Sequence, residues 1–463
     1  MISGLLLATE RRAIIGLAGL YSSRMLGLFM VLPVLALSAE SLQGATPMLV
    51  GLALGVYGLM QALLQIPFGL LSDRLGRKRV IAVGLILFLI GSIIAALADS
   101  IVGIIVGRSL QGSGAVAAAI MALLADQTRE EVRTAAMAMI GLSIGVAFAV
   151  AMVTGPLLSA YFGLSGIFWL TAVLALLGLL VLWKVVPKAP KRVLHRDVGL
   201  DRQQLKSMLL RLDLLRLDIS IFSLHLILMA IFVVIPFRLV EVGFESAYHG
   251  WVYLTVMGLA FIGMVPLVML AEKKRQMKPV FILSVALLTL CLAAMGVSGV
   301  TSWWWLACLL LGFFIAFNLL EATLPSMISK MAPAGAKGTA MGVYSTSQFL
   351  GAFLGGLLGG VLDQYWGHDA VFYGAAVVGV VWLGSVMTMP APRHLASEVV
   401  ALDDETRGDA LDTLMTRLAE VAGVEDVLVV PEERVAYLKV DRQQLDSEAL
   451  ARIAGTQRGQ GRA

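Results

Sequence analysis

The chain has 463 residues, of which 59% are hydrophobic and only 14% are charged. Soluble domains carry about a quarter charged residues, so this composition excludes an ordinary soluble protein and predicts a polytopic membrane protein surrounded by the lipid bilayer. The net charge of +4 indicates no nucleic-acid partner, because the basic residues follow a membrane topology and no nucleic-acid motif is present.

Twelve apolar segments are long enough to cross a bilayer, which takes about 20 residues of helix. Residues 1–10 lack the basic start and the small-residue cleavage site of a removable signal peptide, so the first segment is expected to stay in the chain. The sequence therefore predicts an all-α membrane protein of twelve transmembrane helices in two six-helix halves, 1–186 and 216–390. The expected spans are residues 13–37, 47–71, 79–98, 101–124, 134–160, 165–186, 216–241, 248–271, 278–298, 302–328, 338–362 and 368–389.

Lys and Arg gather in alternate loops. The loops Ser38–Thr46 and Val242–His249 contain none, whereas the longest internal loop, 187–215, is rich in both. Because basic loops stay on the cytoplasmic side, both termini and this linker are expected in the cytoplasm. Within the linker, Asp201–Arg211 is predicted to form an amphipathic helix at the membrane surface.

A short charged turn joins the second and third spans and carries the most distinctive motif. Glycines permit a tight turn and close backbone approach, and a basic run marks the cytoplasmic side. The spacing resembles the signature loop of the major facilitator superfamily, which lies between spans 2 and 3. A hydrophobic hairpin with a basic turn and no such role is the alternative. The residues of the turn are Gly69, Asp73, Arg74, Gly76, Arg77, Lys78 and Arg79.

The two halves also resemble diverged repeats. Thr134–Ala138 opens span 5, and the similar stretch Gly338–Gly342 opens span 11. Repeats of parallel orientation are what this transporter superfamily shows, so the resemblance implies the major facilitator fold.

Polar side chains inside spans are costly, so each is a candidate for function. Here they fall on spans 1, 4, 7 and 10, which line the central cavity in the superfamily. Glu321 follows Asn318 by three residues and shares its helical face. For His225 a hydrogen-bonded core histidine is the alternative, and for Glu321 a buried neutral acid. The candidates are Arg24, Arg108, Gln111, His225, Asn318 and Glu321.

Two further stretches resemble motifs of drug–proton antiporters. Arg108–Gly114 resembles their span 4 motif, and Gly155 with Pro156 stands where their span 5 motif has its glycine-proline pair, although the rest of that motif matches only in part. Many of these antiporters place a carboxylate in span 1, where this chain has only Arg24. Glu321 is therefore the expected proton carrier, with His225 beside it.

The spans and a soluble C-terminal module together resemble YajR-type efflux proteins. This resemblance implies that Asp73, Arg77 and Asp126 form a charge relay, with Asp73 facing the N-terminus of span 11. A carboxylate there satisfies free amide groups and the positive end of the helix dipole.

The soluble module is expected at 397–455 and has the order β-α-β-β-α. Its strands are predicted at Glu398–Leu402, Val424–Val430 and Val435–Val440, and its helices at Asp409–Ala422 and Ser447–Ala454. This order resembles a small α+β ferredoxin-like domain without its last strand. Such modules sometimes bind metals through paired cysteines, but this one has no cysteine, so a regulatory or docking role is expected.

The sequence thus predicts a proton-coupled antiporter of the bacterial inner membrane that exports small amphipathic compounds by alternating access. A proton symporter or uniporter for an organic anion is the alternative, because Arg24 and Arg108 lie in the N-terminal half. A membrane-bound sensor with a cytoplasmic output domain is a third hypothesis. We expect a monomer and neither an enzyme, a cofactor nor a metal, since no nucleophile–base set, metal-ligand cluster or phosphate loop is present.

Overall fold

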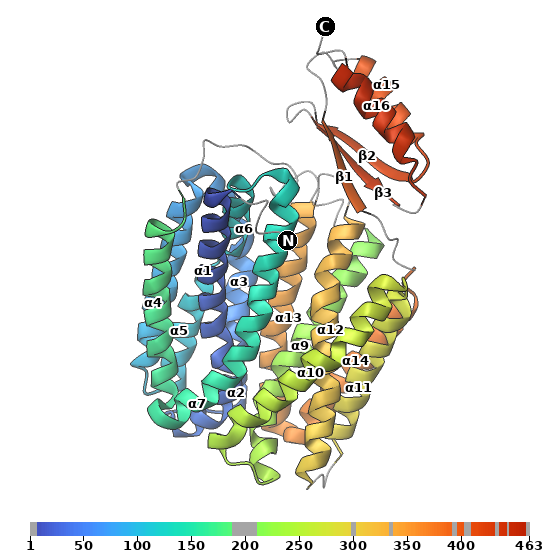
Figure 1. Cartoon of the computed structure of the whole chain (residues 1–463). Helices are drawn as coiled ribbons and strands as arrows, with labels where there is room; N and C mark the ends of the chain where they lie inside the picture. Colours follow the sequence, from blue (N-terminus) through green and yellow to red (C-terminus); the bar gives the residue numbers. More distant parts are fainter. Residues whose placement is uncertain are drawn as a thin grey trace.

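The computed structural model describes residues 7–187, 211–297, 302–332, 337–390, 396–401, 409–430, 435–441 and 444–459. It has two parts, a bundle of long helices and a small α/β domain at one end of the bundle (Figure 1). We call the end that carries the small domain the domain end, and the opposite end the far end. Except for Arg211, the amphipathic helix predicted at Asp201–Arg211 lies outside the described residues.

The first half of the bundle runs to Lys184. Its elements are α1 (Ala8–Met30), α2 (Leu32–Ser38), the 3-10 turn η2 (Ala39–Ser41), α3 (Pro47–Leu75), α4 (Arg77–Ala96), α5 (Ile101–Ser113), α6 (Ala117–Asp126) and α7 (Glu130–Lys184). The second half consists of α9 (Leu212–Glu241), the 3-10 turn η3 (Ser246–Tyr248), α10 (His249–Lys273), α11 (Met277–Met295), α12 (Trp303–Met331), α13 (Lys337–Trp366) and α14 (His368–Met387).

The described part of the chain has eleven helical segments that are long and apolar enough to cross a membrane. Helix α7 has 55 residues, which is about 80 Å of helix and far more than the hydrocarbon core of about 30 Å. At Gly163 its backbone leaves the helical region, with φ 64° and ψ −172°. The chain turns there, so α7 supplies two crossings, and the predicted total of twelve is confirmed.

The segments predicted as spans 1 and 4 are each interrupted by a short break in the helix. Span 1 breaks between α1 and α2, just before Pro33, whose ring has no N–H and clashes with a carbonyl one turn earlier. Span 4 breaks between α5 and α6, where Gly112 and Gly114 lower the helix propensity. There the N–H of Val116 donates to the carbonyl of Gly114 at 2.9 Å instead of continuing the helix.

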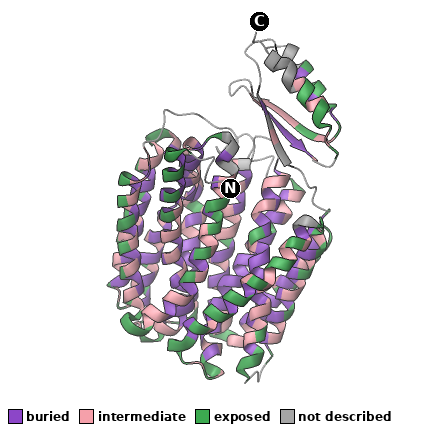
Figure 2. Ribbon diagram, viewed as in Figure 1, coloured by how far each residue is buried: buried purple, intermediate pink, exposed green. Residues whose placement is uncertain are grey.

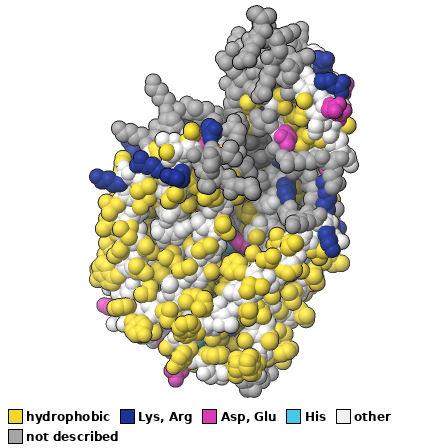
Figure 3. All heavy atoms as spheres, in the orientation of Figure 1, with side chains coloured by type: hydrophobic (Ala, Val, Ile, Leu, Met, Phe, Trp, Pro, Cys, Tyr) yellow, Lys and Arg dark blue, Asp and Glu magenta, His cyan; other side chains and the backbone are white. Residues whose placement is uncertain are grey.

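Apolar side chains cover both the inside and the outside of the bundle. Buried positions lie on the helix faces that meet in the interior (Figure 2). Large exposed side chains such as Ile15, Leu180 and Val381 lie on the surface, and hydrophobic atoms dominate the visible sides of the bundle (Figure 3). Such a surface in water would promote association, so it indicates contact with lipid.

The two halves meet in backbone contact along α3 and α13. A Cβ atom added at Gly55 or Gly58 would lie 2.6 Å from the carbonyl oxygens of Phe353 and Phe349, respectively. At the far end, the N–H of Met48 donates to the side-chain oxygen of Gln364 at 3.2 Å. Because α3 begins and α13 ends at the far end, the halves are closed against each other there.

The small domain has the predicted ferredoxin-like order. Its elements are β1 (Ala396–Ala401), α15 (Asp409–Ala419), β2 (Val424–Val430), β3 (Val435–Val440) and α16 (Ser447–Gly459). The sheet order is β1-β3-β2, with β3 antiparallel to both neighbours. Helices α15 and α16 lie on one face of the sheet (Figure 1), and the core between them includes Val400, Leu418 and Leu438.

The small domain contacts the second half of the bundle. The ammonium group of Lys439 in β3 donates to the carbonyl oxygens of Ser329 at 2.8 Å and Lys330 at 3.3 Å. Both carbonyls belong to the last turn of α12, where a helix has free acceptors and a negative dipole end. Arg275, in the turn between α10 and α11, pairs with Asp441 at 3.3 Å.

Candidate functional site

Three side chains from three helices form a polar site in the second half. His225 of α9 and Gln348 of α13 lie 2.8 Å apart between their Nε2 atoms, and Gln348 also donates to Oε1 of Glu321 in α12 at 3.3 Å. Oε2 of Glu321 lies 3.8 Å from Nε2 of His225. The two residues predicted for proton coupling are therefore adjacent, with the Gln348 amide bridging them.

This geometry suits a shared proton. The Gln348 amide donates to a neutral imidazole, so His225 accepts in that state and Glu321 is free to hold a charge. A proton on His225 creates an imidazolium next to the carboxylate instead, so the charge on one group acts on the other. The His225 side chain is largely buried, whereas the Glu321 side chain is 37% exposed. Glu321 is therefore the more accessible of the two side chains.

Arg24 lies buried in the first half, without an acidic partner among the described residues. It is 2% exposed, donates from Nη2 to the Tyr57 hydroxyl at 2.9 Å, and lies over the rings of Tyr57 and Phe88. Its Nε and Nη1 have no hydrogen-bond partner. A buried guanidinium that uses so few of its donors is expensive to maintain, which indicates a functional reason for it.

Arg108 also lies over the Tyr57 ring, 5.2 Å from its centroid. It is fully buried and donates to the backbone carbonyls of Ala53 at 3.3 Å and Leu54 at 3.5 Å. It also donates to Gln111 at 3.3 Å, and the Gln111 amide donates to Ser92 at 2.8 Å. The predicted pair Arg108 and Gln111 thus connects α5 to α3 and α4. Backbone carbonyl oxygens and the Gln111 amide oxygen, and not a carboxylate, accept the hydrogen bonds of the Arg108 guanidinium.

The two polar groups lie at similar depth on opposite sides of the contact between the halves. Gly58, next to Tyr57, touches the backbone of Phe349, which follows Gln348, and Phe349 packs against the cluster around Tyr57. Aromatic rings continue the connection: Phe29 lies 5.0 Å from Phe148, and Phe148 lies 5.9 Å from Phe317. The site therefore combines buried cations on one half, an acid and a histidine on the other, and aromatic surface between them.

The other predicted residues of the site, Asn318, Gly155 and Pro156, lie on α12 and α7. Asn318 is buried on α12, one turn from Glu321, and its Nδ2 has no hydrogen-bond partner. Pro156 lies inside α7. A Cβ added at Gly155 would lie 2.5 Å from the carbonyl oxygen of Met30, so α7 packs directly on α1 where span 1 breaks.

The charge relay forms within the first half. Arg77 pairs with Asp73, donates from Nε to Asp126 at 3.2 Å and donates to Ser72 at 2.9 Å. Gly76, with φ 97°, makes the turn between α3 and α4. Asp73 has no hydrogen bond or ion pair with α13 among the described residues, which leave out the residues just before that helix, so its implied contact with the N-terminus of span 11 stays a prediction.

The other two residues of the predicted loop differ in burial. Gly69 is buried in α3, and its carbonyl oxygen accepts from the Ser72 hydroxyl at 2.7 Å. Arg74 is exposed in the last turn of α3. The buried glycine thus supports the serine that Arg77 contacts, while Arg74 adds positive charge to the surface of the domain end.

The two acids of the relay are expected to differ in their effect on stability. Asp126→Ala leaves the Nε donor of a partly buried arginine without its partner, so we expect a loss of about 1–3 kcal/mol in the free energy of unfolding. Asp73→Ala is expected to cost at most about 1 kcal/mol, because its side chain is 42% exposed. Thermal unfolding of the detergent-solubilised variants measures both, with the exposed far-end Asp99→Ala as control. A larger loss for Asp73 than for Asp126 contradicts this ranking.

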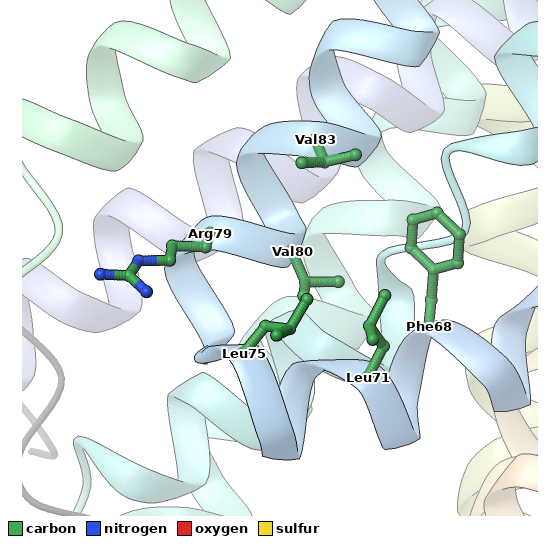
Figure 4. A pocket seen from close by; sticks show the side chains of 6 residues that line it. All are labelled: Phe68, Leu71, Leu75, Arg79, Val80 and Val83. Atoms are coloured by element: carbon green, nitrogen blue, oxygen red, sulfur yellow. The ribbon is translucent and has the colours of Figure 1, made fainter.

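Two apolar hollows lie apart from the polar centre. One of about 200 Å³ lies beside the turn between α3 and α4 and is lined by Phe68, Leu71, Leu75, Arg79, Val80 and Val83 (Figure 4). The other, of about 440 Å³, lies between α1 and α7 and includes Ser22, Leu26 and Val146. Neither is lined by the acid, the histidine or the buried arginines, so the chemistry of the chain is not located in them.

Comparison with known protein families accounts for this architecture. The model of the Major Facilitator Superfamily matches residues 17–356 and, again, 315–412. The chain belongs to the major facilitator superfamily. A second model, the YajR YAM domain, matches residues 402–450, which cover most of the small α/β domain. The predicted resemblance to YajR-type proteins with a ferredoxin-like C-terminal domain is thus confirmed.

Individual relatives also support this assignment to the superfamily. The inner membrane transport protein YajR of Escherichia coli K12 is 49% identical over 433 residues, covering 93% of this chain and 94% of the relative. An uncharacterized transporter of Buchnera aphidicola is 37% identical over 71% of this chain and 84% of its own. A solved bacterial homologue of the lysosomal transporter Spinster has a TM-score of 0.67 at 13% identity, covers 82% of this chain and 97% of its own, and supports the fold alone. The chain is therefore an inner membrane transporter of this superfamily.

The sequence analysis did not identify two partners of the site, Tyr57 and Gln348, nor the buried acid Asp218. Tyr57 and Gln348 carry no charge, so they do not stand out within a span as ionisable groups do. Asp218 lies within the expected span 216–241, and its spacing of seven residues from His225 on the same helical face was a usable signal.

Proposed function

We propose that this transporter exports small amphipathic compounds across the inner membrane in exchange for protons. The observation that carries the proposal is the Glu321, His225 and Gln348 group, in which two titratable side chains lie 3.8 Å apart and one of them is partly exposed. Aromatic rings between the halves provide an apolar surface for a substrate, and polar groups on both sides supply its orientation.

The charge distribution supports an orientation with the domain end in the cytoplasm. Lys and Arg side chains gather at that end on the visible face (Figure 3). Charged residues at the far end are mostly acidic, and the one arginine described there, Arg238, pairs with Asp369 and Glu241. Because basic residues are retained inside, we propose that both termini are cytoplasmic. We infer export because the stretch Arg108–Gly114 and the pair Gly155 and Pro156 resemble motifs of drug–proton antiporters.

Transport of an organic anion is the second candidate, because Arg24 keeps two guanidinium nitrogens without partners. Uptake by proteoliposomes under an imposed pH gradient separates the two, with ethidium as an amphipathic cation and fluorescein as an organic anion. Movement of ethidium against the proton flow supports cation export. Movement of fluorescein alone, together with protons, favours anion symport.

For the small domain we propose regulation through α12, the helix that carries Glu321 and Asn318. Lys439→Met keeps the apolar stem and removes the ammonium group from the end of α12, an interaction worth about 0.3–2 kcal/mol. Hydrogen exchange in the last turn of α12 is therefore expected to become faster. The exposed Lys184→Met at the end of α7 is the matched control. Equal exchange in Lys439→Met and the parent protein shows that the domain does not act on α12.

A further inference from the structure

Asp218 is a buried acid that the coupling site does not include. It lies on α9, 5% exposed, and its Oδ1 has no hydrogen-bond partner. Among the described residues it belongs to no ion pair. A carboxyl group inside a membrane span is costly, so one that lacks a hydrogen bond or a counter-charge requires a functional explanation.

Asp218 lies on the same face of α9 as His225, because seven residues are close to two helical turns. On the neighbouring helix α13, Tyr344 precedes Gln348 by one turn and is also buried, with no hydrogen-bond partner for its hydroxyl. Helices α9 and α13 pack along each other and both run from the domain end to the far end. Tyr344 therefore lies at a depth between Asp218 and the coupling site.

Electrostatic interactions connect Asp218, Tyr344 and Glu321. The charges of both Asp218 and Glu321 act on Tyr344, although its hydroxyl is hydrogen-bonded to neither acid. The nearest charged residues on α9 itself, Asp213 and Arg216, pair with each other at 4.0 Å. The order from the domain end inward is thus Asp218, Tyr344, and then Glu321 with His225.

Of the residues Asp218, Tyr344, Glu321 and His225, Asp218 lies closest to the domain end, as their positions along the helices show. It is the seventh residue of α9, about 9 Å from the start of the helix at 1.5 Å per residue. Glu321 is ten residues before the end of α12, or about 15 Å by the same rise. A proton that leaves Glu321 toward the domain end thus meets Asp218 on the way.

We propose that Asp218 is a second protonation site of the transport cycle, which receives the proton from the Glu321 and His225 pair and releases it at the domain end. The transfer breaks an O–H or N–H bond in the pair and forms an O–H bond on the Asp218 carboxylate. The inference rests on the proposed proton coupling and adds the residue through which the proton leaves.

Infrared spectra of the protein in lipid nanodiscs, recorded across a range of pH, test this without a substrate. A protonated carboxyl group has a C=O stretch that ionisation removes. We expect a band that disappears as the pH rises, is missing in Asp218→Asn, and is retained in the control Asp213→Asn and in Glu321→Gln. In Asp218→Glu the band is expected to shift and still respond to pH, which keeps the assignment testable if the Asn variant fails to fold.

Two results overturn the proposal. A band that Asp218→Asn removes but that does not change with pH shows a permanently neutral structural acid. A spectrum that Asp218→Asn leaves unchanged shows that this carboxyl carries no exchangeable proton. The proposed function fails separately: if Asp218 gives a band that responds to pH but Glu321→Gln transports with undiminished coupling, the protonation site stands and the role of Glu321 falls.

Discussion

Glu321→Gln is expected to abolish transport driven by a pH gradient, while exchange of substrate between the two sides continues. The amide keeps the volume of the side chain and its hydrogen bond with Gln348, which is 3.3 Å long in the parent protein. It resembles the protonated acid and cannot release a proton, so the carrier binds substrate but is no longer tied to proton movement. His225→Gln is expected to change mainly the pH dependence, because the Glu321 carboxylate is retained.

The measurement is accumulation of a transported compound by proteoliposomes with and without an imposed pH gradient. Gradient-driven accumulation in Glu321→Gln should fall to the level of protein-free vesicles. The matched control is Glu241→Gln, the same exchange at an exposed far-end acid that pairs with Arg238, and it should transport like the parent. Full coupling in Glu321→Gln would place the carrier elsewhere, with His225 as the next candidate.

Arg24→Met is expected to leave the fold intact or more stable and to remove transport. The guanidinium is buried with two nitrogens that have no partner, and an apolar side chain of similar volume removes the cost of keeping this charge away from water. If the Arg24 guanidinium binds the substrate, Arg24→Met should keep or raise the stability of the protein and remove its transport activity.

Thermal unfolding in detergent and uptake by proteoliposomes give the two quantities for Arg24→Met. The control is Arg12→Met on the exposed part of the same helix, which should change neither. A strongly destabilised Arg24→Met protein that still transports would show that the arginine serves the packing of α1 against Tyr57 and Phe88, and not the substrate.

The spans and the C-terminal domain were predictable because their signals are long and repeated. Twelve apolar segments leave little choice of architecture, and the strand and helix order after residue 396 follows from short periodic stretches. The breaks at Val31 and at Gly114–Val116 were not predicted, since a single Pro or Gly inside a membrane helix often leaves it continuous. Where a helix breaks depends on its neighbours, which the local sequence does not contain.

The site was predictable where charge alone points to it. Glu321, His225, Arg24 and Arg108 stand out because ionisable groups in spans are rare. Their partners do not stand out, because Gln348 and Tyr57 are ordinary residues until the packing of α13 and α3 brings them into contact. The charge relay shows the same limit: Asp73, Arg77 and Asp126 come together as the resemblance implies, whereas the contact of Asp73 with span 11 stays a prediction.

Exchange of substrate for protons is tested most directly by the pH inside proteoliposomes that contain the parent protein and a trapped pH-sensitive dye. Small amphipathic compounds are added outside one at a time, without an imposed gradient. Antiport predicts that the lumen becomes more alkaline as a compound enters and protons leave, whichever way the protein is inserted, and that Glu321→Gln abolishes this signal. Uptake of compound with an acidified lumen, or with no pH change, would contradict the exchange.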